Sequence, residues 1–122
     1  MKSTFQESSE NYLETILVLS RHNSKVRSVD IAEAMDFTRP SVSIAMKKLR
    51  ENSLIEVDTD GYITLTRAGR KIAESMYERH MLISDWLISL GVDEVTAMDD
   101  ACRMEHVISE QSFLAIKSLI MD

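Results

Sequence analysis

Cysteine, proline and glycine are scarce in this sequence of 122 residues. Three glycines and one proline leave little material for the many tight turns of an all-β fold, and aromatic residues contribute only 6%. The single cysteine, Cys102, excludes a disulfide within the chain and suits a reducing compartment. We therefore expect a mainly helical, cytoplasmic protein.

Long apolar runs are also missing. No stretch approaches the roughly 18 uninterrupted apolar residues that mark a membrane span. The first seven residues lack the apolar core of a secretory signal. No segment resembles a nucleophile–base pair or a phosphate-binding loop. We therefore expect neither a membrane partner nor an enzyme.

The charge is distributed unevenly. The net charge of −6 argues against a nucleic-acid partner, but the distribution of charge matters more than its sum. Residues 21–50 carry seven basic and three acidic side chains, whereas residues 67–122 carry six basic and ten acidic ones. A basic segment thus stands beside an acidic one that could bind cations.

Apolar spacing predicts six helices and one hairpin. The helices are expected over residues 8–20, 29–35, 39–52, 67–90, 93–107 and 110–120. Short strands are expected at residues 55–57 and 62–65, where the pair Asp60-Gly61 supplies positive φ. On the long fourth helix, an apolar stripe that includes His80 and ends at Leu90 should face the protein interior.

The order helix, short break, helix and hairpin is that of a winged helix-turn-helix. Ser28 and Thr38 are expected to cap the two helices of the motif. Asp36 stands in the turn where glycine is usual, and it tolerates left-handed geometry better than most residues. A solvated charged face on an ordinary three-helix lobe is the alternative interpretation.

The second helix of the motif offers polar side chains on the face opposite its apolar residues. Arg39 can bind guanine with two hydrogen bonds, whereas Lys47 and Lys48 are suited to phosphate. The full set of expected DNA-binding residues is Arg27, Ser28, Thr38, Arg39, Pro40, Ser41, Ser43, Lys47 and Lys48.

A cluster of metal-ligand residue types stands near the C-terminus. Cys102, Glu105 and His106 lie at positions i, i+3 and i+4, on one face of a helix. A thiolate, a carboxylate and an imidazole together suit a first-row divalent transition metal. The alternatives are that Cys102 is a small core residue and His80 a hydrogen-bonded core histidine.

Several segments together resemble the diphtheria-toxin-repressor family of iron- or manganese-dependent transcriptional repressors. The segments are Ser-Glu-Asn-Tyr-Leu-Glu (9–14), Val-Asp-Ile-Ala-Glu-Ala-Met (29–35), Pro-Ser-Val (40–42), Thr-Leu-Thr-Arg-Ala-Gly (64–69), Arg-His-Met-Leu (79–82) and Asp-Ala-Cys-Arg-Met-Glu-His (100–106). The resemblance extends over nearly the whole chain. It implies a homodimer that binds a palindromic double-stranded DNA operator when Fe²⁺ or Mn²⁺ is bound.

The resemblance also implies a ligand set. The main metal site would use Asn11, Cys102, Glu105 and His106, while Glu14 and His80 match ligands of the manganese branch. The iron branch typically has Met at the position of Asn11 and the manganese branch Asp, whereas Cys102 matches the iron branch. Ser84 and Met98 stand where ancillary Glu and His ligands are common, so the resemblance does not imply a complete second site.

The sequence thus predicts a winged helix-turn-helix DNA-binding domain over residues 1–66. A helical metal-binding and dimerisation domain follows over residues 67–122. The predicted function is metal-dependent repression of metal-homeostasis genes. One alternative is a regulator of the same fold whose degenerate metal site responds to another signal. The other is a metal-binding protein without DNA specificity.

Overall fold

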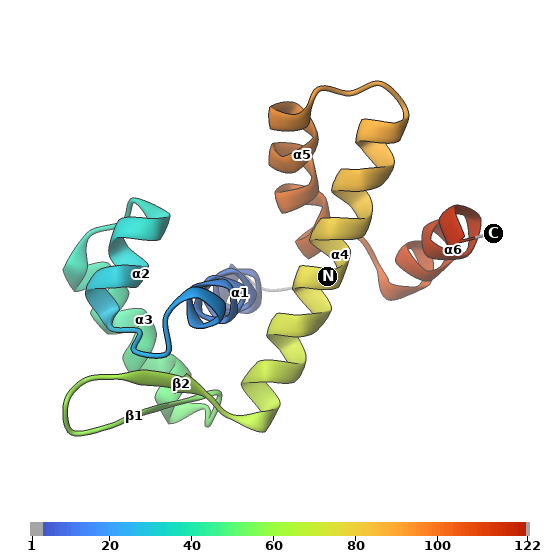
Figure 1. Ribbon diagram of the computed structural model, residues 1–122. Coiled ribbons are helices and arrows are strands. Elements are labelled where there is room, and N and C mark those ends of the chain that lie inside the picture. The colour runs from blue at the N-terminus through green and yellow to red at the C-terminus, as the bar shows by residue number, and fades with distance from the viewer. Residues whose placement is uncertain (1–3, 122) are drawn as a thin grey trace. The chain divides into compact units, whose positions relative to one another are not determined.

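The computed structural model describes residues 4–121 and confirms a mainly helical fold with a winged helix-turn-helix (Figure 1). The elements follow the predicted order. They are α1 (Thr4–His22), α2 (Ser28–Met35), α3 (Arg39–Glu51), β1 (Ile55–Val57), β2 (Ile63–Leu65), α4 (Arg67–Ser89), α5 (Glu94–Val107) and α6 (Glu110–Met121).

The chain forms two compact units, and the division between them falls within α4. The N-terminal unit contains residues 4–74, and the C-terminal unit contains the described residues from Ser75 onward. Among the described residues, no helix is both long enough and apolar enough to cross a membrane.

Apolar side chains from α1, α2, α3 and the hairpin form the core of the N-terminal unit. Helical spacing gives each helix one apolar stripe, and burying that stripe provides most of the stability of a short helix. In α3 the stripe is Val42, Met46 and Leu49, which are 0%, 4% and 1% exposed. The other fully buried side chains include Leu13, Ile16, Ile31, Ile55 and Ile63.

The turn between α2 and α3 follows from two residues. Asp36 adopts the left-handed conformation with φ of 56°, and the N–H of Phe37 donates to the Ala32 carbonyl over 3.0 Å. Thr38 then caps α3, since its hydroxyl oxygen accepts a hydrogen bond from the Ser41 N–H at 3.3 Å. Both expectations for this turn are confirmed.

The start of α2 differs from the expectation. Arg27 holds the N-cap position, and Ser28 is the first helical residue rather than the cap. The Asp30 carboxylate accepts a hydrogen bond from the Arg27 N–H at 2.8 Å. This bond from the first turn of the helix satisfies a terminal donor without any side-chain cap, so a serine is not required there.

The hairpin forms the wing. Its two strands are antiparallel, with Ile55 opposite Leu65, and the second strand begins one residue later than expected. Gly61 supplies the positive φ, at 84°, whereas Asp60 does not share it. Instead, the Asp58 carboxylate accepts hydrogen bonds from two N–H groups in the turn, each at 2.9 Å.

A close approach of backbones anchors the wing to the start of α4. Thr66 caps α4 by accepting a hydrogen bond from the Gly69 N–H, while its own hydroxyl donates to the Ser53 carbonyl. Gly69 packs so closely against Leu54 that a Cβ at this position would overlap the Leu54 carbonyl oxygen. No local sequence pattern indicates this steric requirement.

In the C-terminal unit, α4, α5 and α6 share a small apolar core. Ile83, Ala101 and Phe113 are buried at its centre. Asp93 caps α5, and hydrogen bonds from Thr96 hold the pKa of its carboxyl below the usual value. Gly91, with φ of 99°, follows the end of α4 as predicted, whereas Leu90 is 65% exposed and does not continue the buried stripe.

Candidate metal centre and DNA-binding surface

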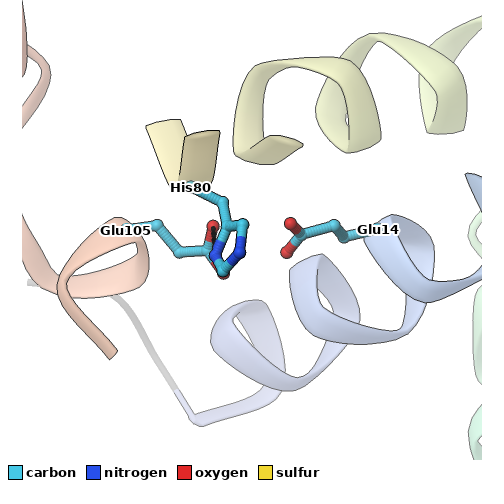
Figure 2. Close-up of side chains that lie close together, drawn as sticks. All are labelled: Glu14, His80 and Glu105. Carbon is cyan, nitrogen blue, oxygen red and sulfur yellow. Dashed lines mark ion pairs between the residues drawn. The ribbon is translucent and has the colours of Figure 1, made fainter. Parts of the chain in front are cut away.

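A buried carboxylate lies between two imidazoles in the C-terminal unit. The side chain of Glu105, on α5, is 0% exposed. His80 Nδ1, from α4, lies 3.8 Å from Glu105 Oε2, and His106 Nε2 lies 3.4 Å from Glu105 Oε1. Figure 2 draws the side chains of His80 and Glu105. Two helices thus bring together one carboxylate and two imidazoles, all expected as metal ligands.

The arrangement fits a divalent cation. Burying an ionised carboxylate costs several kcal/mol unless a positive charge or hydrogen bonds compensate. Among the described residues, the buried Nδ1 of His80 makes no hydrogen bond. An imidazole nitrogen and carboxylate oxygens are the donors that first-row divalent metals take in proteins. The donor chemistry therefore suits a transition metal such as Mn²⁺ or Fe²⁺.

Arg79 joins the end of α5 to α4, and the sequence analysis did not identify it. Its Nη1 donates to the carbonyl oxygens of Glu105 and Ile108 at 3.1 and 2.9 Å. Its guanidinium lies 5.2 Å from the centre of the Phe113 ring. Its position offers a sequence signal, because Arg79 follows Met76 by three residues and precedes Ile83 by four on the buried face of α4.

Replacing Arg79 with leucine should destabilise the protein by about 2–3 kcal/mol, because two carbonyl groups lose a charged donor. Arg79→Lys should lose less, since a single ammonium can still reach one carbonyl. Urea unfolding measures both changes. An unchanged midpoint in Arg79→Leu would show that these hydrogen bonds contribute nothing to stability.

The remaining predicted ligands belong to two helices, Cys102 to α5 and Asn11 and Glu14 to α1. Cys102 is half-buried on α5, and among the described residues no group of three acidic, histidine or cysteine ligand atoms includes it. Asn11 and Glu14 belong to α1 of the N-terminal unit, where Asn11 is half-buried and Glu14 is buried. Figure 2 also draws the Glu14 side chain.

The predicted DNA-binding residues lie on the outer surface of the N-terminal unit. On α3, every one of them is exposed, on the faces away from the buried stripe of Val42, Met46 and Leu49. Arg27 and Thr38 are exposed as well, and Ser28 is half-buried. The α3 residues concerned are Arg39, Pro40, Ser41, Ser43, Lys47 and Lys48.

Cations gather where α2 begins, beside α3 and the wing. The Arg27 guanidinium lies 4.5 Å from the centre of the Tyr62 ring, so the wing holds this charge in place. A cavity of about 200 Å³ is lined by Ser28, Ser43, Lys47 and Arg50 together with Met46 and Val57. Hydroxyl, ammonium and guanidinium groups at one opening suit a phosphate oxygen.

Family models match both parts of the chain. Residues 4–63 match the model described as "Iron dependent repressor, N-terminal DNA binding domain". Residues 66–122 match "Iron dependent repressor, metal binding and dimerisation domain". Together the two matches leave only a few residues outside.

Curated relatives share about a third of the residues. The transcriptional regulator MntR of Escherichia coli is 34% identical over 108 residues, which are 88% of this chain and 70% of the relative. An uncharacterized HTH-type transcriptional regulator of Methanocaldococcus jannaschii is 30% identical over 113 residues, which are 91% of this chain and 90% of the relative.

Solved structures share the fold. The manganese regulator SloR is 30% identical, with a TM-score of 0.82, and the match covers 92% of this chain and 53% of SloR. A manganese-dependent transcriptional repressor solved with manganese is 28% identical, with a TM-score of 0.83, and the match covers 90% of this chain and 51% of the repressor. This chain therefore spans about half the length of these solved chains.

The two family models divide the chain in the same order as the structural evidence, with a winged helix first and a helical unit with a buried ligand cluster second. The relatives named above are transcriptional regulators or repressors, in agreement with both family models. The chain therefore belongs to the family of metal-dependent repressors related to the diphtheria-toxin repressor and MntR.

Proposed function

We propose that this protein is a DNA-binding transcriptional regulator that represses metal-homeostasis genes when it binds Fe²⁺ or Mn²⁺. One observation carries the proposal: a carboxylate with no exposed surface, Glu105, lies beside the imidazoles of His80 and His106. A buried charge with this donor set is costly unless it binds a cation. The exposed polar face of α3 supplies the DNA-binding surface.

The ligands we propose come from three helices. His80, Glu105, His106 and Cys102 are the ligands we propose from α4 and α5, and Asn11 and Glu14 those from α1. When bound, a divalent metal would supply positive charge next to the carboxylate ligands. We propose a domain boundary between residues 66 and 67, where the wing ends and α4 begins.

The choice of metal depends on the donor atoms. The oxygen donors of Asn11, Glu14 and Glu105 suit Mn²⁺, whereas the Cys102 thiolate favours Fe²⁺. Two of the structural relatives are described as manganese regulators, which supports Mn²⁺ as the first metal to test.

The proposal includes a homodimer on a palindromic operator, acting in the cytoplasm without catalysis. Exposed apolar side chains in the C-terminal unit support a dimer, since an apolar surface of this kind usually marks a protein interface. On α6 they are Leu114, Leu119 and Met121, which are 52%, 69% and 72% exposed.

The direct test is a DNA-binding titration of chelator-stripped protein under anaerobic conditions. A duplex enriched from a randomised library in the presence of Mn²⁺ serves as the probe, and Mn²⁺, Fe²⁺, Co²⁺ and Mg²⁺ are compared by fluorescence anisotropy. We expect tight binding with Mn²⁺ or Fe²⁺ and weak binding without metal. If no transition metal stimulates DNA binding below millimolar concentration, the metal-sensing function is overturned and a regulator with a degenerate metal site is favoured.

Arg39→Ala should weaken binding to the enriched duplex by about 1–3 kcal/mol, because bidentate contacts to guanine provide discrimination of that size. Binding to a scrambled duplex should change much less. Arg103→Ala is the matched control, since it removes an exposed guanidinium from α5. An unchanged ratio of specific to nonspecific affinity would show that Arg39 does not contact bases.

A further inference from the structure

An apolar side chain lies at the centre of the outward face of α3. Pro40, Ile44 and Lys47 repeat the spacing of the buried stripe Val42, Met46 and Leu49, two residues earlier at each position. At about 100° per residue, a shift of two residues places the first set on the opposite side of the helix. Ile44 is 59% exposed.

The exposure of Ile44 is not explained by packing within the N-terminal unit. Ile44 borders a cavity of about 350 Å³ beside α1, and Phe5 and Lys48 also line this cavity. More than half of the Ile44 surface nevertheless remains exposed to solvent. Among the residues of α3, all of which the structure describes, it is the one large aliphatic side chain that is exposed. Hydroxyl and cationic side chains surround it on the same face.

An aliphatic side chain in this position has one natural partner in the major groove. The thymine C5-methyl group is the apolar feature that a base pair presents there, and apolar side chains contact it. The surrounding cations and hydroxyls suit phosphates and polar base edges instead. Ile44 therefore differs in chemistry from the hydroxyl and cationic side chains on the same face.

We propose that Ile44 determines sequence specificity by packing against a thymine methyl group in each half-site of the operator. This inference rests on the proposed DNA-binding function and adds a base preference to it. Removal of one methyl contact should weaken DNA binding by about 0.8 kcal/mol, which is roughly a fourfold loss of affinity. A dimer that makes the contact in both half-sites should lose roughly 15-fold when both contacts are removed.

The test uses the duplex enriched from a randomised library with Mn²⁺ bound. Each thymine is replaced singly by deoxyuridine, which removes the methyl group and leaves the hydrogen-bonding groups unchanged. We expect one position per half-site at which wild-type protein binds about fourfold more weakly. Ile44→Ala should bind the thymine and uracil duplexes equally at that position.

Lys47→Ala is the control, because it alters the same face of α3 one turn away. It should weaken binding to the thymine and uracil duplexes by the same factor, so that the methyl effect persists. Wild-type protein that tolerates deoxyuridine at every position would overturn the inference, and so would an Ile44→Ala variant that still loses fourfold. A library that enriches no sequence would instead overturn the proposed function, and the inference with it.

Discussion

Glu105→Gln should abolish metal-dependent DNA binding while leaving the fold intact. The carboxylate has no exposed surface, and the imidazoles of His80 and His106 lie 3.8 and 3.4 Å from its oxygens. An amide keeps the size of the side chain but removes the charge that attracts a divalent cation. Since loss of an outer-shell partner already costs 10–100-fold in metal affinity, loss of this ligand should cost at least about 100-fold.

The stability of metal-free Glu105→Gln, in contrast to its metal affinity, should not fall. Without metal, the variant no longer buries a carboxylate charge, so its free energy of unfolding should equal or exceed that of the metal-free wild type. Glu94→Gln, an exposed carboxylate in the first turn of α5, is the matched control and should bind metal normally. If Glu105→Gln still bound DNA with the metal dependence of wild type, the sensing site would lie elsewhere.

Gly69→Ala should destabilise the protein by about 3 kcal/mol, although helix propensity alone predicts a gain of about 1 kcal/mol. Gly69 is buried in the first turn of α4, where a Cβ would overlap the Leu54 carbonyl oxygen. The Leu54 carbonyl cannot move freely, because it accepts a hydrogen bond from the Thr66 N–H at 3.1 Å. The overlap is therefore with backbone that is held in place.

Urea unfolding of Gly69→Ala gives the sign of the effect. Ser75→Ala, at an exposed position of the same helix, controls for propensity and should be neutral or slightly stabilising. A Gly69→Ala variant as stable as wild type would show that the start of α4 can shift away from the wing at little cost.

Local chemistry accounts for the features of the fold that were predicted correctly. Thr38 caps α3, Asp36 adopts positive φ and Gly91 follows α4, because each depends only on the type of that residue and on its immediate neighbours. The cap of α2 was predicted wrongly at Ser28, since the Asp30 carboxylate accepts a hydrogen bond from the Arg27 N–H and no serine cap is needed. Boundaries shift when such alternatives are close in energy.

Long-range packing accounts for what the sequence could not predict. Gly69 and Arg79 depend on partners 15 and 26 residues away, Leu54 and Glu105, and no local pattern indicates either contact. For the metal site, spacing placed Glu105 and His106 on one helix, but only the packing of α4 against α5 brings His80 beside them. The roles of Cys102 and Asn11 remain predictions.

The central claim is that metal binding and DNA binding are coupled, and coupling is reciprocal. Isothermal titration of chelator-stripped protein with Mn²⁺, in the absence and presence of the enriched duplex, measures it directly. We predict that the duplex raises the metal affinity by the factor by which Mn²⁺ raises the DNA affinity, about 5–150-fold. Equal metal affinities with and without the duplex would contradict a metal-dependent repressor.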